Sequence, residues 1–356
     1  MKYLFVVLTF FLFSCTAQDD GPVDGSETAD LFLRGVDLSD LPTLRSSNTI
    51  FYKTENVVED MLYTLKDKGV NVVRLKLWHT PASEQASMSE VRAFAKEIKR
   101  MGLKLWLTVH YSDSWADPAQ QAVPALWEGV SYDSLKDSVY AYTSGIVNEI
   151  DPDYIQIGNE INSGILFPHG RIETNFTHFK SLLSEGVQAV RDNSYDTKIM
   201  LHFAGFQGSD WFFNEMDNLD FDIIALSYYP LWHGKDLVAL SDKISSLGYT
   251  FKKPVVIAET AYPFTLEWDD WTTNIVGAES QIILPDYPAS PIGQKDFVMK
   301  IRDIMTSDEN GIGFCYWGGE LVAYRGSQAK DGSVWENQAL YDFNQIALPV
   351  MDVFRE

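Results

Sequence analysis

"NVVRLKLWHTPASEQASMSEVRAFAKEIKRMGLKLWLTVHY", residues 71–111, contains the pattern on which the fold depends. Residues 71–78 and 104–111 are near-continuous apolar runs of strand length. The segment between them has apolar residues spaced for one face of a helix, which stops at Gly102: Val91, Phe94, Ala95, Ile98 and Met101. Two apolar strands joined by an amphipathic helix predict parallel strands in a sheet that is buried on both faces.

The same unit recurs from residue 31 onward. Eight strands are predicted, over residues 31–39, 71–78, 104–111, 154–160, 198–203, 222–230, 254–262 and 311–319. Helical periodicity is clear in the segments after strands one, two, four, six and seven. It is weaker after strands three and eight, and the segment after strand five is long enough for only a short helix. The first helical stripe begins near Val58, where Asn56 and Glu59 are spaced as a capping box.

The repeat predicts an α/β fold with a single (β/α)8 TIM barrel over residues 31–356. No segment rich in Pro, Gly and Ser interrupts it, so one domain is favoured over two. An open doubly wound sheet is the alternative, but no stretch resembles the glycine-rich phosphate turn of that fold.

Composition limits the possible partners. The chain has 356 residues, 46% of them apolar, enough for a large core. Its formal charge of -22 argues against nucleic acid and against binding to anionic lipid through a basic patch. We expect a monomer that acts on a neutral or cationic substrate.

The N-terminus is patterned for export. Met1 and Lys2 precede an apolar run that is too short to span a bilayer, so residues 1–14 are predicted to be a signal peptide. The run ends at "LFSC", which resembles a bacterial lipobox with Cys15 as the lipidated residue. Residues 16–30 are small and acidic and predict a flexible tether, similar to those of surface-exported bacterial lipoproteins. We expect an outer-membrane lipoprotein at the cell surface, attached to the membrane through this lipid only; the alternative is an ordinary signal peptide.

Two carboxylates end strands on opposite sides of the predicted barrel mouth. Strand four ends in Asn159-Glu160 and strand seven ends at Glu259. A pair of carboxyl groups across a cavity is the arrangement that glycoside hydrolysis needs, with one acid and one nucleophile or base. Like charges held close together raise the pKa of one of the pair. The alternative is that each is a polar strand end that only favours solubility.

Other polar and aromatic residues are predicted at the same rim. Arg74 is a charge inside an apolar strand, which is costly unless an anion pairs with it. Either a carboxylate at the mouth or Asp37 can do so. His110 can orient a carboxylate, bind a sugar hydroxyl or be a satisfied core residue. Trp78, Tyr228, Tyr229 and Trp317 end further strands.

Two long loops follow strands three and seven, over residues 112–130 and 263–292. In a TIM barrel the loops that follow the strands lie on the catalytic face, so these two are predicted to wall the site. Four tryptophans are candidates for stacking on sugar rings: Trp115, Trp232, Trp268 and Trp317.

Several stretches resemble glycoside hydrolase family 53, the endo-β-1,4-galactanases of clan A. They are "GVDLS" (35–39), "GVNVVRLKLWHTP" (69–81), "HYSDSWADPAQQ" (110–121), "QIGNEINSG" (156–164), "LSYYPLWHG" (226–234) and "VVIAETAYP" (255–263). The resemblance implies cleavage of β-1,4-galactosidic bonds in galactan or type I arabinogalactan with retention of configuration. It implies Glu160 as acid/base, Glu259 as nucleophile, Asn159 on the sugar 2-hydroxyl and Trp317 beneath the sugar.

The chain departs from the resemblance in one loop. Bacterial members often bind calcium after strand seven through alternating Asp, His and Asn. Here only Glu267, Asp269 and Asp270 are candidate ligands, whereas calcium takes six or more oxygens, so no cofactor is expected.

The catalytic pair does not encode the sugar, which leaves two other functions open. One is a clan A endo-glycanase acting on mannan, xylan or β-glucan. The other is a surface glycan-binding lipoprotein without catalysis, although such a protein is expected to lack one of the two glutamates.

Overall fold

A computed structural model of the protein describes Met1 and residues 32–355. The predicted signal peptide, the lipidated Cys15 and the tether over residues 16–30 therefore lie outside the described residues. The helices of the described part are all too short or too polar to cross a membrane.

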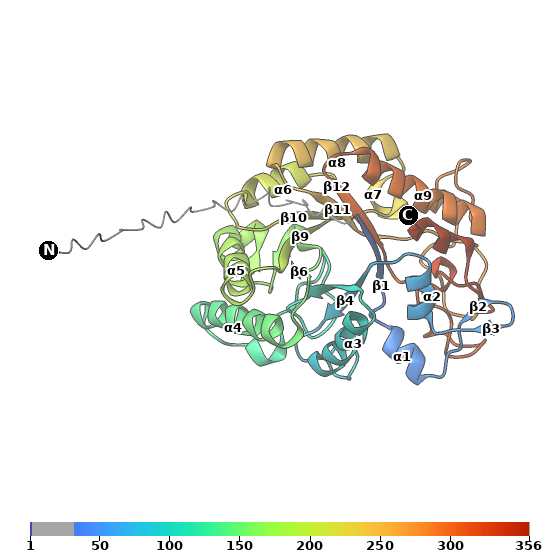
Figure 1. The fold of residues 1–356 in the computed structure, drawn as a ribbon, viewed down its shortest axis with the longest axis horizontal. Coiled ribbons are helices and arrows are strands. Elements are labelled where there is room, and N and C mark those ends of the chain that lie inside the picture. The colour runs from blue at the N-terminus through green and yellow to red at the C-terminus, as the bar shows by residue number, and fades with distance from the viewer. Residues whose placement is uncertain (2–31, 356) are drawn as a thin grey trace. The chain divides into compact units, whose positions relative to one another are not determined.

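Eight parallel strands close into a barrel (Figure 1). Around the barrel they follow one another in chain order, and the last pairs with the first. Their bounds are β1 Leu33–Asp37, β4 Val72–Leu77, β5 Lys104–Val109, β6 Tyr154–Ile157, β9 Lys198–Ala204, β10 Ile223–Ser227, β11 Val255–Thr260 and β12 Gly311–Tyr316. The predictions of eight strands and of a TIM barrel are confirmed.

Helices surround the strands on the outside of the barrel (Figure 1). They are α1 Leu41–Ser46, α2 Met61–Asp67, α3 Met88–Arg100, α4 Tyr132–Ile150, α5 Ile172–Asn193, α6 Ser209–Met216, α7 Pro230–His233, α8 Leu237–Phe251 and α9 Pro291–Ser307. The helix after the fifth barrel strand is short, as predicted, and α4 follows the third.

Two helix predictions were wrong. Helix α2 begins at Met61, because the Asp60 carboxylate caps it by accepting from the Leu62 N–H, while Val58 lies in the short strand β3 (Val57–Val58). Strand β3 pairs with β2 (Tyr52–Thr54), so Asn56 lies in the turn of this hairpin and caps no helix. After β12 the described chain forms only 3-10 turns, η4 Glu336–Gln338 and η5 Pro349–Phe354.

Smaller elements lie in the loops. Strands β7 (Gly164–Ile165) and β8 (Gly170–Arg171) form a second hairpin, and three more 3-10 turns are η1 Ala125–Trp127, η2 Ile161–Ser163 and η3 Glu279–Gln281.

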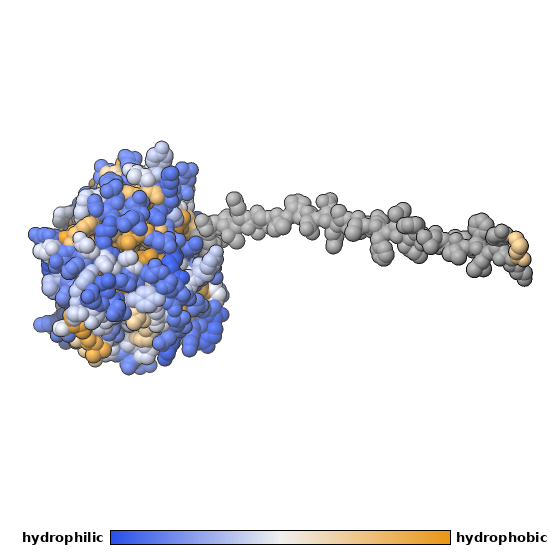
Figure 2. All heavy atoms as spheres, turned by 90° about the vertical axis from the view of Figure 1, so that its left-hand side faces the viewer, coloured by the Kyte–Doolittle hydropathy of each residue, from blue (hydrophilic) through white to orange (hydrophobic). Residues whose placement is uncertain are grey.

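The barrel interior changes character along its axis. Away from the carboxyl ends of the strands, the interior is filled by an apolar cluster: Leu33, Val72, Trp106, Met200, Ile223, Ala225, Val256, Ala258 and Cys315. Cys315 is a buried free thiol. Toward the carboxyl ends of the strands the buried residues become polar, including Arg74, Gln156, His202 and Glu259. The outer face on the side of α4 and α5 is mainly hydrophilic, with small separate apolar patches (Figure 2).

Candidate active site

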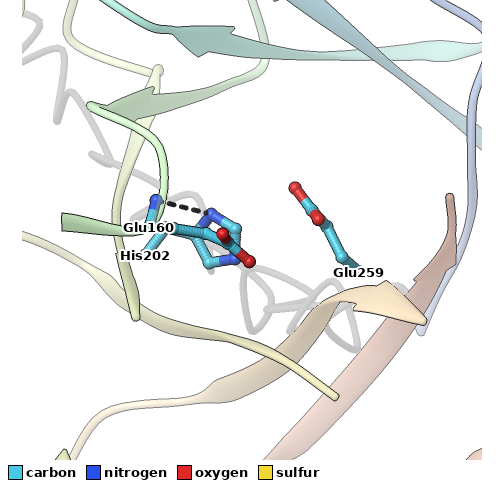
Figure 3. Close-up of side chains that lie close together, drawn as sticks. All are labelled: Glu160, His202 and Glu259. Carbon is cyan, nitrogen blue, oxygen red and sulfur yellow. Dashed lines mark hydrogen bonds between the residues drawn. The ribbon is translucent and has the colours of Figure 1, made fainter. Parts of the chain in front are cut away.

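The two predicted carboxylates meet at the carboxyl end of the barrel. Glu259 is near the end of β11, and Glu160 lies three residues beyond β6 with φ of 46°, a left-handed conformation that is uncommon for a residue with a side chain. One ligating atom from each of Glu160, His202 and Glu259 lies within 4.8 Å of the others. Figure 3 shows Glu160 against His202, with Glu259 across the open space. This separation is close to the ~5 Å found in retaining glycosidases.

Arg74 joins the strands beneath this pair. Its Nη2 donates to Glu259 Oε1 at 2.7 Å and to Asn159 Oδ1 at 2.9 Å. Nη1 donates to Asp37 Oδ2 at 2.6 Å, and Nε donates to Gln156 Oε1 at 2.9 Å. The two roles considered for Arg74, partner of a mouth carboxylate and partner of Asp37, are therefore both present.

Glu259 is held by two donors. Besides Arg74, the Tyr229 hydroxyl donates to Glu259 Oε2 at 3.1 Å. Burial raises the pKa of Glu259, while the charge of Arg74 and the Tyr229 hydrogen bond act to lower it. Burial, followed by the charge of Glu259, raises the pKa of Tyr229 well above its usual value, so this phenol keeps its proton. The net direction of the Glu259 pKa is upward, and Arg74 and Tyr229 are the contacts that stabilise its ionised form.

Within residues 32–355, no Lys or Arg side chain contacts the Glu160 carboxyl group directly. Burial, and then the charge of Glu259, raise the pKa of Glu160 to about 8. The main opposing contact is the hydroxyl of Ser227, which donates to Glu160 Oε1 at 2.6 Å. Glu160 therefore holds a proton near neutrality while Glu259 is stabilised as an anion.

A cleft of about 760 Å³ opens above both carboxylates. Among the predicted binding residues, Asn159, Trp115, Trp232 and Trp317 line it. Trp317 lies between two other indoles, with ring centroids 5.8 Å from Trp115 and 4.8 Å from Trp335. The cleft therefore presents aromatic faces directly beside the carboxylate pair.

The walls of the cleft differ partly from the prediction. Residues 115–119 of the loop after β5 line it, as expected. From the long loop after β11 only Ile275 does so, while the loop after β12 contributes most of that side. This third loop supplies Trp317, Leu321, Tyr324 and residues 332–335.

Besides Arg74, four residues predicted to bind substrate do not line the cleft. Tyr228 was wrong: it is fully buried and its hydroxyl donates to Gly234 O at 2.9 Å, because side chains alternate along the chain and Tyr229 takes the inward position. Asp37 lies beneath the site on Arg74. His110 accepts from the Ala116 N–H at 3.0 Å, which matches the core role considered for it. Trp78 packs edge-on against Trp115.

Trp268, a further stacking candidate, is half exposed and also outside the cleft lining. Four polar or aromatic residues close to the carboxylates were also not predicted. Trp335 is buried between Trp317 and Trp232. Gln156, His202 and Ser227 are fully buried behind the carboxylates. Their only sequence signal was a polar residue inside an apolar strand, the same signal that singled out Arg74.

Comparison with known proteins places this geometry in a family. The profile described as "Glycosyl hydrolase family 53" matches residues 33–354. The chain belongs to glycoside hydrolase family 53. An arabinogalactan endo-beta-1,4-galactanase of Cellvibrio japonicus is 34% identical over 346 residues, 91% of this chain and 90% of that protein. An endo-beta-1,4-galactanase of Bacillus subtilis is 30% identical, covering 91% and 85% of the two chains.

Solved structures agree with this assignment. The family 53 catalytic domain from Ignisphaera aggregans superposes with a TM-score of 0.85 at 36% identity, covering 94% of this chain and 98% of that one. A fungal beta-1,4-galactanase gives 0.79 at 25% identity, covering 91% and 99%. A beta-1,4-mannanase of family 113 gives 0.54 at 15% identity and shares the fold alone. The protein is thus a glycoside hydrolase on a TIM barrel.

The three calcium candidates of this family 53 enzyme do not form one ligand set. Glu267 is exposed, and Asp270 Oδ1 accepts from the Thr272 N–H at 2.6 Å. Asp270 Oδ2 and Glu336 Oε2 are buried without a hydrogen-bond partner. Glu267, Asp269 and Asp270 do not come together as a possible ion-binding group among the described residues, and calcium takes six or more oxygens, so these residues do not fit the ion.

The carboxylate environments predict a pH dependence. With Glu160 as the acid, kcat/KM on a soluble β-1,4-galactan should fall as the pH rises through about 8, the pKa of Glu160. It should also fall at low pH, where Glu259 takes up a proton and loses its charge. The measurement is initial rate against pH in constant ionic strength. A profile that stays flat from pH 7 to pH 10 would contradict the assignment of the acid.

Proposed function

We propose that the protein is a retaining endo-β-1,4-galactanase with Glu259 as nucleophile and Glu160 as acid/base. The observation that carries the proposal is the carboxylate pair within 4.8 Å at the cleft, in which only Glu259 contacts a cation. Family membership and the galactanases among its relatives support the reaction and the substrate.

The reaction is a double displacement. Glu259 attacks the anomeric carbon and the bond to the leaving oxygen breaks, while Glu160 gives that oxygen its proton. A water then attacks the anomeric carbon of the glycosyl-enzyme, Glu160 takes a proton from it, and Glu259 leaves as a carboxylate. The net result is one water added across one glycosidic bond, with configuration retained.

Several neighbours have parts in this scheme. Arg74 and Tyr229 keep Glu259 ionised and in place through the contacts at 2.7 and 3.1 Å. Asn159 lines the cleft with its amide oriented by Arg74 and by donation to Ala116 O at 2.9 Å, in position for the sugar 2-hydroxyl. Trp317 supplies the flat apolar face on which a sugar ring stacks.

The substrate is the part that most needs a direct test, because mannan, xylan and β-glucan enzymes share the catalytic pair. We expect reducing-sugar release from β-1,4-galactan to exceed release from mannan, xylan and carboxymethylcellulose by at least about a hundredfold, since a hydrogen-bonding site rejects the wrong hydroxyl geometry strongly. The product ladder over time identifies endo action by early oligosaccharides of mixed length. Comparable rates on mannan would contradict the galactanase assignment.

The two carboxylate roles are tested by substitution. Glu160→Gln and Glu259→Gln should each lose nearly all turnover of galactan while keeping its binding, since each removes an ionisable group but little volume. The alanine variants are then assayed on an activated aryl galactoside with added azide. Glu160→Ala should give the β-galactosyl azide, and Glu259→Ala should give the α-galactosyl azide. The opposite products would exchange the two roles.

A matched control comes from a third buried carboxyl. Glu320 accepts from the Asp40 N–H at 2.7 Å, and burial, followed by the charge of Asp40, raises the pKa of Glu320 well above its usual value. Because Glu320 does not line the cleft and Gln keeps its size, Glu320→Gln should leave turnover unchanged. Normal turnover in either catalytic variant would contradict the mechanism.

The location rests on the N-terminal sequence. We infer that the enzyme is a lipoprotein of the outer membrane with its barrel at the cell surface, joined through Cys15 and the acidic segment over residues 16–30, and that it works as a monomer. The lipobox-like "LFSC" and the small, acidic residues that follow it over 16–30 support this location.

Lipidation of the Cys15 thiol predicts that removing this thiol changes where the enzyme is found in the cell. In a host that processes lipoproteins, Cys15→Ser should move the enzyme from the membrane fraction to the soluble fraction, because the lipid has no other attachment point. Protease treatment of intact cells then tests surface exposure of the unaltered protein. Membrane association that survives Cys15→Ser would contradict the anchor.

A further inference from the structure

A buried histidine and serine lie behind Glu160, and the mechanism above does not use them. His202 belongs to β9 and Ser227 ends β10, and both are fully buried. His202 Nε2 lies 2.8 Å from Ser227 Oγ, which lies 2.6 Å from Glu160 Oε1. The three groups form a continuous line that ends on the acid/base.

The hydrogen bonds give this line a direction. The Glu160 N–H donates to His202 Nδ1 at 3.3 Å (Figure 3), so Nδ1 carries no proton and Nε2–H donates to Ser227. With Ser227 Oγ accepting from His202, its own proton lies toward Glu160. Burial, and then the charge of Arg74, lower the pKa of His202 well below its usual value, so the ring is neutral and has one N–H.

The opposite direction has one supporting contact. His202 Nδ1 also lies 3.2 Å from Asn159 Oδ1, and a proton on Nδ1 would donate there. That oxygen already accepts from Arg74 Nη2 at 2.9 Å. Nε2 would then accept the Ser227 proton, and Ser227 could not donate to Glu160.

We propose that His202 and Ser227 determine which oxygen of Glu160 carries the catalytic proton. A hydroxyl that donates to Oε1 makes Oε1 the carbonyl oxygen of the protonated acid and places its proton on Oε2. Glu160 lines the cleft. Some buried polar atoms of the described chain lack a hydrogen-bond partner, and Glu160 Oε2 does not belong to that group. Oε2 is therefore the oxygen left for the glycosidic bond.

The same hydroxyl serves the ionised state. Once Glu160 has given up its proton, Ser227 still donates to Oε1, and Oε2 has a free lone pair for the proton of the attacking water. The Glu160 N–H bond to His202 holds the left-handed backbone at this residue. Glu160 can thus alternate between acid and base without changing its rotamer. Ser227 and His202 are positioning residues, and their role rests on the proposed function.

The test is Ser227→Ala, with Ser227→Thr to restore the hydroxyl. On galactan, whose leaving group needs protonation, kcat/KM should fall by about ten- to a hundredfold, the usual effect of losing a hydrogen bond to a charged group. On a dinitrophenyl galactoside, whose leaving group needs no proton, kcat/KM should change less than about threefold. The alkaline limb on galactan should move to higher pH, because Ser227 stabilises the carboxylate. Ser227→Thr should recover both readouts.

The control is Ser112→Ala. Ser112 is also buried near the end of a barrel strand, but its Oγ has no hydrogen-bond partner, so this variant should behave like the unaltered enzyme. Equal losses on both substrates in Ser227→Ala, or no loss on either, would overturn the proposal. If Glu160→Gln and Glu259→Gln are inactive in the same assays, such a result removes only the role of Ser227 and leaves the proposed function intact.

A second measurement tests the direction of the His202–Ser227 hydrogen bond in the unaltered protein. In protein whose histidines carry a nitrogen label, NMR should show the His202 ring with a proton on Nε2 and no proton on Nδ1 from pH 6 to pH 8. A proton at Nδ1 would overturn the proposal, because Ser227 would then donate to His202 and not to Glu160.

Discussion

The catalytic end of this barrel depends on one buried guanidinium. Arg74 points inward from β4, where a lone charge is costly, and four contacts offset that cost, to Asp37, Gln156, Asn159 and Glu259. These partners come from or follow β1, β6 and β11, so one side chain ties together distant parts of the barrel wall. Removing one member of such a buried pair typically costs about 3–5 kcal/mol, because the other charge stays buried.

The same guanidinium separates two chemically identical groups. Glu259 contacts Arg74 directly, whereas the Glu160 carboxyl group accepts from the neutral Ser227 and is also subject to the negative charge of Glu259. One carboxyl group is therefore stabilised as an anion and the other as an acid. The physical difference between the two carboxyl groups arises from their positions in the barrel, since each pKa is set by the groups that surround it in the fold.

Substrate contacts are assembled differently from the catalytic pair. The carboxylates stand on or just past strands, which are held by the barrel hydrogen bonds, whereas the aromatic walls come from loops. Trp115 follows β5, and both Trp317 and Trp335 follow β12, yet the Trp317 ring centroid lies 5.8 Å from that of Trp115 and 4.8 Å from that of Trp335. Strands of fixed register position the chemistry, and loops of variable length shape the groove around it.

The sequence alone determined the eight strands, the closed barrel, the two glutamates and the buried Arg74, because strand periodicity and a charge in an apolar run are local features. It could not separate Tyr228 from Tyr229, place Trp335 in the cleft or show that the loop after β12 forms a wall. Those outcomes depend on side-chain direction, bulges and the path of long loops. The line from His202 through Ser227 to Glu160 was decided only by the tertiary structure, since β6, β9 and β10 must lie side by side before three distant polar residues can share hydrogen bonds.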